Sequence, residues 1–177
     1  MSSLRYAEGT SVSVAKSQQE ISVLLQKAGA HPVGFQFHDT HAVVAFTLTT
    51  NIPEKKRDGV IVQVAEQRKT HIMMRLEVPN RVDFAKKRVR HWMQTCTPEE
   101  QAKRWEQACR ERWRALALVL KAKLISVESK VETVEEAFLA HLVVNDQGKS
   151  KRFGEVIINQ MVAHQNHGGR LLLGTGS

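Results

Sequence analysis

Residues 97–128 read TPEEQAKRWEQACRERWRALALVLKAKLISVE, and this stretch decides the fold class of the chain. Thr97 is a favourable N-cap, Pro98 suits the first helical position, and the two glutamates that follow face the positive end of the helix dipole. Apolar side chains then recur at steps of three and four residues, at Trp105, Cys109, Trp113, Leu116, Leu120, Leu124 and Val127. The pattern predicts an unbroken helix over about 98–128, roughly 45 Å long, which can cross an entire sheet.

The residues before this helix predict a shorter helix and an antiparallel meander. Residues 4–14 contain alternating stretches, as at 11–14, and predict a short first strand, and a capping-box pattern that begins at Ser17 predicts a helix over 17–29. Runs rich in β-branched and aromatic residues at 33–37 and 42–48 flank a turn-prone segment and predict a hairpin. Residues 69–78 alternate in part and predict a further strand, which Pro79 ends.

Other segments carry weaker signals. Residues 60–64 fit a short strand or the return of an exposed loop, and residues 80–96 fit a short helix or an ordered loop. After the long helix, the sequence predicts a short helix from Thr133 to Leu139, an edge strand over 142–144 and a helix over 154–164.

Together these elements predict an α+β fold: a three- to four-stranded antiparallel meander with a short N-terminal helix and one long helix packed on the sheet. The chain has 177 residues, of which 42% are hydrophobic and 25% charged, as in ordinary globular domains. Residues 1–145 are expected to form one domain. Residues 146–177 are expected to form a helix and a tail, whose leucines at 171–173 dock on the core or on a neighbouring subunit, so we expect a homo-oligomer.

Positive charge gathers in one segment of the chain. The formal net charge is +8, and residues 81–124 hold twelve Lys and Arg against five Asp and Glu. Cations interleaved with aromatic side chains suit the phosphates and unstacked bases of single-stranded nucleic acid. The candidate binding residues are Lys86, Lys87, Arg88, Arg90, Trp92, Lys103, Arg104, Arg110, Arg112 and Arg114. Trp92 is the predicted stacking residue, because Trp105 and Trp113 belong to the apolar stripe of the long helix; the alternative is that the cations only solvate one helix face.

No pattern in the sequence predicts catalysis. The chain has neither a Walker phosphate loop nor a Gly-x-Ser-x-Gly turn. His38 with His41, and His164 with His167, have the spacing of metal ligands, but no third ligand stands at a recognisable distance. We therefore predict no enzyme, no cofactor and no metal, and we interpret Cys109 as a core residue.

Two blocks of residues resemble small uncharacterised proteins encoded by tailed phages and prophages. The first block is Arg5-Tyr6-Ala7-Glu8-Gly9-Thr10, followed by Ser17, Glu20-Ile21, Leu25 and Gly29-Ala30. The second is Trp113-Arg114-Ala115-Leu116 with Lys121-Ala122-Lys123-Leu124, Val127-Glu128, Thr133, Glu136 and Phe138-Leu139-Ala140-His141. The resemblance implies phage origin and carries no known activity. The order of a meander and a long helix is also similar to the core of phage single-strand annealing proteins.

These observations predict a phage-encoded nucleic-acid-binding accessory protein that favours single strands, in phage replication, recombination or host takeover. The alternative is an anti-defence protein that binds a host protein or sequesters a nucleotide signal, since a basic cluster also suits an acidic protein surface. The sequence has no apolar run of membrane length and no recognisable signal peptide, so we expect no membrane partner and a place in the cytoplasm of a bacterial host.

Overall fold

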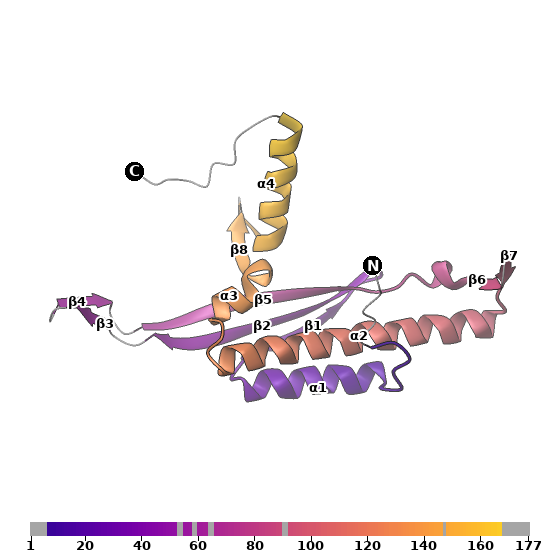
Figure 1. Ribbon diagram of the computed structural model, residues 1–177, viewed down its shortest axis with the longest axis horizontal. Helices are drawn as coiled ribbons and strands as arrows, with labels where there is room; N and C mark the ends of the chain where they lie inside the picture. The colour runs from indigo at the N-terminus through magenta and orange to yellow at the C-terminus, as the bar shows by residue number, and fades with distance from the viewer. Residues whose placement is uncertain are drawn as a thin grey trace.

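The computed structural model describes residues 7–52, 55–57, 60–63, 66–89, 92–146 and 148–167, and it confirms the predicted α+β class (Figure 1). The first half of the chain contains α1 (Val14–Lys27), β1 (Val33–Phe37), β2 (His41–Ile52), β3 (Lys55–Arg57), β4 (Val60–Gln63) and β5 (Glu66–Glu77). The second half contains the 3₁₀ helix η1 (Arg81–Phe84), β6 (Lys86–Val89), β7 (Trp92–Thr95), α2 (Pro98–Glu128), α3 (Val134–Phe138), the 3₁₀ helix η2 (Leu139–His141), β8 (Val143–Asp146), β9 (Lys149–Arg152) and α4 (Phe153–His167).

The main sheet has three antiparallel strands in the order β1–β2–β5. Val44 at the centre of β2 lies opposite Phe35 of β1 and Met74 of β5. Strands β2 and β5 are longer than predicted, and the small β3–β4 hairpin follows where they end (Figure 1). The predicted hairpin and meander are therefore confirmed.

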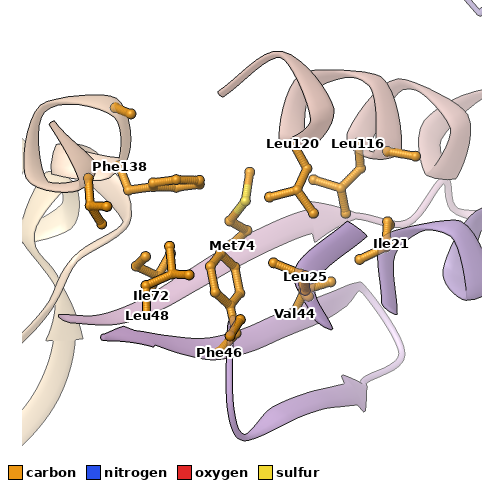
Figure 2. Packing of buried hydrophobic residues seen from close by; sticks show 14 of the residues in the cluster. Ile21, Leu25, Val44, Phe46, Leu48, Ile72, Met74, Leu116, Leu120 and Phe138 are labelled. Carbon is orange, nitrogen blue, oxygen red and sulfur yellow. The ribbon is translucent and has the colours of Figure 1, made fainter. Parts of the chain in front are cut away.

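Helices α1 and α2 cover the same face of the main sheet (Figure 1). Figure 2 shows Ile21 and Leu25 of α1 and Leu120 of α2 pointing toward Val44 and Phe46 on the sheet. These side chains are buried because the alternating residues of β2 meet the apolar stripes of two helices. The tryptophan of the stripe, Trp113, is also buried, as its position predicts.

The long helix begins as predicted. The Thr97 hydroxyl accepts from the Glu100 amide, and the Glu100 carboxylate accepts from the Thr97 amide, which completes a capping box with Pro98 in the first turn. A second capping box, formed by Thr133 and Glu136, starts α3. Both caps are local signals, so the structure reproduces them where the sequence places them.

The predictions for the first residues were wrong in two respects. Residues 11–13 are not in a strand, and α1 begins at Val14, with Ser13 as its N-cap accepting from the Lys16 amide. The predicted capping residue, Ser17, is fully buried within the helix. Ser17 lies on the same face as Ile21 and Leu25, so burial of that face extends the helix by one turn beyond the local pattern.

Residues 80–96, predicted as a short helix or an ordered loop, contain a short 3₁₀ helix and two short strands. A short 3₁₀ turn, η1, leads into an antiparallel hairpin of β6 and β7, with Lys86 opposite Thr95 and Val89 opposite Trp92. Strands of four residues are too short to show a clear alternation, so the prediction of a helix or loop missed them.

After α3, the predicted strand and helix are confirmed as β8 and α4. Strand β8 pairs with β9, and α4 points away from the main sheet (Figure 1). In the described part of the chain, no helix combines the length and apolarity that crossing a membrane requires. The leucines at 171–173 lie outside the described residues.

Candidate nucleic-acid interface

The segment that links β5 to α2 is docked on the first two turns of α2 by polar contacts. The Trp105 indole donates to the carbonyl of Pro79 at 2.8 Å, and the Gln101 amide donates to the carbonyl of Arg81 at 2.9 Å. Both bonds satisfy backbone carbonyls that no strand partner reaches. The helix therefore acts as a platform that fixes the start of this segment.

Arg104 of α2 attaches the β6–β7 hairpin itself. Its Nη1 atom donates to the carbonyl of Lys86 at 2.9 Å, to that of Phe84 at 3.3 Å and to Cys96 Sγ at 3.2 Å. The guanidinium also lies 5.8 Å from the centre of the Phe84 ring. Arg104 thus contacts the beginning and the end of the hairpin, which gives it a structural role where the sequence predicted a phosphate ligand.

The register of β6 and β7 separates the basic side chains of the hairpin into two faces. Successive residues of a strand point to opposite faces, so Lys86 and Arg88 share a face with Met93 and Thr95. Lys87 points to the other face, where its ammonium forms a 2.7 Å ion pair with Glu100 of α2. The hydrogen bond from Lys87 is the largest of the effects that lower the pKa of the Glu100 carboxyl. One hairpin face therefore turns toward α2, and the other carries two cations outward.

Two more of the predicted arginines are engaged within the protein. Arg110 donates to the Gln107 side chain from Nε at 3.1 Å and from Nη2 at 2.7 Å. Arg114 forms an ion pair with Glu20, which joins α2 to α1. Arg114 therefore joins two helices, whereas Arg110 makes its contacts within α2.

Four predicted cations are exposed and make no hydrogen bond or ion pair within the part of the chain that the structure describes: Lys86, Arg88, Lys103 and Arg112. Lys103 and Arg112 are nine residues apart on one helix, so they point to opposite sides of it. Of these four described cations, Lys86 and Arg88 share one face of a strand. Arg90 lies outside the described residues.

The exposed aromatic side chain of this surface is Trp92, which is 74% exposed at the start of β7. Its neighbour Met93, 61% exposed, lies on the face that carries Arg88. Trp92 is on the opposite face of the strand, at the edge of the hairpin. We refer to Lys86, Arg88, Trp92, Met93 and Thr95 as the hairpin surface.

Sequence reasoning missed Met93 and Thr95 because it did not predict β7. If residues 86–88 had been treated as a strand that pairs with the residues after position 91, Met93 and Thr95 would have been identified, because residues paired across two strands lie on the same face. The helical spacing predicted that Trp105 and Trp113 face the apolar stripe of α2. Trp113 is buried, and Trp105 is half-buried and donates a hydrogen bond to the carbonyl of Pro79.

The remaining candidates for chemistry are two pairs of histidines and a cysteine. The rings of His38 and His41 stack with centres 4.4 Å apart, but within the described ranges no three His, Cys, Asp or Glu side chains are placed to share a metal ion. His164 and His167 lie in α4, and the structure does not describe their side chains. Cys109 is buried, as predicted, and its burial raises the pKa of the thiol.

Comparisons of the chain with models of protein families, with curated proteins and with solved structures found no match.

Proposed function

We propose that the protein is a phage-encoded nucleic-acid-binding accessory protein that holds single strands on the hairpin surface. The observation that carries the proposal is that one small hairpin has two unpaired cations, Lys86 and Arg88, on one face, and an exposed indole, Trp92, on the other face where β7 begins. The hairpin lies beyond the end of the main sheet, beside the N-terminal end of α2 (Figure 1).

The spacing of the cations favours a phosphate backbone. Lys86 and Arg88 are two residues apart on one face of a strand, so their side chains emerge about 7 Å apart, close to the step between successive phosphates of an extended strand. Neither side chain has to break an internal hydrogen bond or ion pair before it binds. This is the physical difference from Lys87, Arg104 and Arg114.

The exposed apolar side chains favour unpaired bases over a duplex. An indole in water offers a face on which any base can stack, which contributes about 1–3 kcal/mol per base in proteins that bind single strands. In a duplex the faces of the bases are occupied by their neighbours, so Trp92 and Met93 would remain uncovered. Single strands therefore make better use of this surface.

Fluorescence anisotropy with labelled single-stranded and duplex oligonucleotides, at low and near-physiological salt, tests the proposal. The double variant K86A/R88A should weaken single-strand binding and lower the slope of log K against log salt by about 1.4, because each lost phosphate contact removes roughly 0.7. W92A should weaken binding about 5- to 150-fold, which corresponds to the loss of one stacked base.

The matched control is K16A/K69A, which removes the same charge from exposed lysines on α1 and β5. This variant should retain the salt slope of the wild type to within a few tenths. If K86A/R88A binds as tightly as K16A/K69A, the hairpin surface is not the binding site. A wild-type protein that binds no oligonucleotide at low salt would replace the proposal with the second prediction, a protein partner or nucleotide signal.

A further inference from the structure

A groove of about 540 Å³ opens between the end of α1 and the last two turns of α2. Its base is apolar, because Leu48 of β2 and Val134 of α3 are buried there. Leu24 of α1 and Leu124 of α2, both half-buried, line its two sides, and the exposed Ile125 lies at its edge. Small-molecule sites in proteins occupy about 300–1,000 Å³, so the groove is large enough for a small organic ligand.

The fold leaves this groove uncovered because α1 ends before α2 does. Ala117 and Leu124 lie on the same side of α2, since seven residues make nearly two full turns of a helix. Ala117 is fully buried, but the larger Leu124 is only half-buried. Helix α1 ends at Lys27, so it does not enclose this side of the last turns of α2. Apolar surface of the kind that packs in the core is therefore open to a ligand.

Three charged side chains border the groove, and two of them are cations. Lys27 and Lys121 are exposed and make no hydrogen bond or ion pair within the described residues. The third, Glu128, forms no ion pair with either lysine and lies two turns, about 10 Å, beyond Lys121 on α2. Thr49 and Thr50 of β2 complete the polar part of the lining. A groove with apolar walls and an excess of cations at its edge attracts anions.

The two lysines do not join the helices. The ion pair that does so is formed by Glu20 of α1 and Arg114 of α2. Lys27 is on the same side of α1 as Glu20, and Lys121 is on the same side of α2 as Arg114, each seven residues further along. Two lysines cannot neutralise each other. The dipole of α1 favours a cation at its last residue, Lys27, but it does not explain Lys121, which lies two turns before the end of α2.

We propose that this groove binds a fatty acid. The carboxylate contacts Lys27 and Lys121. The alkyl chain packs on the three leucines of the groove, Leu24, Leu48 and Leu124. Leucine side chains offer no donor or acceptor, so a polar ligand would lose its hydrogen bonds with water on these walls, whereas an alkyl chain gains from burial. This inference goes beyond the proposed function, and the groove shares no residue with the hairpin surface.

Displacement of the fluorescent fatty acid cis-parinaric acid by laurate tests the site on the full chain. The wild type should bind the fluorescent probe saturably, with one site per chain, and laurate should displace it. The double variant K27A/K121A should weaken laurate binding about 2- to 30-fold, as expected for the loss of two solvent-exposed charge contacts. The same variant should bind dodecanol as the wild type does, because dodecanol has the alkyl chain without the charge.

The matched control for charge is K16A/K69A, which removes two exposed lysines that lie outside the groove and should bind laurate as the wild type does. A wild type that shows no saturable binding would overturn the proposal. A K27A/K121A protein that binds laurate as tightly as K16A/K69A would also overturn it.

The variant I125E tests the apolar part of the groove. It sets a carboxylate beside the alkyl chain and should weaken both laurate and dodecanol about tenfold or more. V119E is the matched control, because Val119 is 48% exposed on the same helix, Ile125 is 49% exposed, and Val119 lies outside the groove. Equal affinities of I125E and V119E would overturn the proposal, and circular dichroism reports whether each variant is folded. None of these substitutions lies in the hairpin surface, so a failure here leaves the nucleic-acid proposal standing.

Discussion

Replacing Arg104 with alanine should loosen the β6–β7 hairpin without unfolding the protein. The side chain donates to the carbonyls of Lys86 and Phe84 and to Cys96 Sγ, so R104A removes three contacts between the ends of the hairpin and α2 and leaves the Lys87–Glu100 ion pair. None of these partners belongs to the hydrophobic cluster between the helices and the sheet. The change should therefore act on a local opening of the hairpin and leave the core intact.

The size of the effect follows from the bonds lost. A hydrogen bond to a charged group contributes about 1.5–3 kcal/mol when it is protected from water, and less when it is exposed. Because Arg104 is exposed, we expect about 1–2 kcal/mol for the whole set. Amide hydrogens of residues 86–89 and 92–95 should then exchange roughly 5 to 30 times faster. The global free energy of unfolding should change by less than about 0.5 kcal/mol.

Hydrogen–deuterium exchange with mass spectrometry measures the local effect, and urea denaturation measures the global one. K103A is the matched control, since Lys103 is the exposed neighbour on the same helix and makes no hydrogen bond or ion pair within the described ranges. If R104A and K103A show the same exchange at the hairpin, the attachment by Arg104 is refuted. If exchange rises equally in α2 and the main sheet, the effect is global and the reasoning is also wrong.

Two further predictions concern the core and its pH dependence. Phe138 is fully buried and meets Phe46 edge-on at 5.7 Å, so F138A should lower the unfolding free energy by about 3–5 kcal/mol in urea denaturation, and a loss under 1 kcal/mol would contradict this packing. Burial, followed by the charges of Lys123 and Arg152, lowers the pKa of His141 below its ordinary value of 6.5. The unfolded chain therefore binds a proton at His141 more readily, so stability should fall as the pH drops below about 6.5, and H141Q should reduce that slope. An unchanged slope in H141Q would show that other groups control the acid sensitivity.

Elements with strong local signals were predictable from the sequence. The Thr97 cap, the stripe of α2 and the hairpin of β1 and β2 are each encoded within neighbouring residues, and the structure contains all three. The start of α1 was not predictable from the sequence, because Ser13 and Ser17 both suit an N-cap. Only the burial of Ser17 against the core shows that the helix begins after Ser13.

The candidate site divides in the same way. Composition located the excess of positive charge between residues 81 and 124, and the tertiary structure decided which cations are available. Arg114 is bound by a glutamate 94 positions away, and Arg104 by a carbonyl 18 positions away, so nothing near them in the chain indicates their partners. Lys86 and Arg88 remain available to a ligand because the register of the two four-residue strands, β6 and β7, places both side chains on the outward face.

The sequence by itself thus determined the α+β class, the length of the central helix and the segment that carries the charge, because capping, periodicity and composition act over a few residues. Only the tertiary structure decided which face of each element is covered. It divided the predicted cations into those that hold the fold together and those that face solvent, and it placed Ile125 at the edge of the groove beside the end of α1. That division depends on contacts between residues far apart in the chain, which packing of the core brings together.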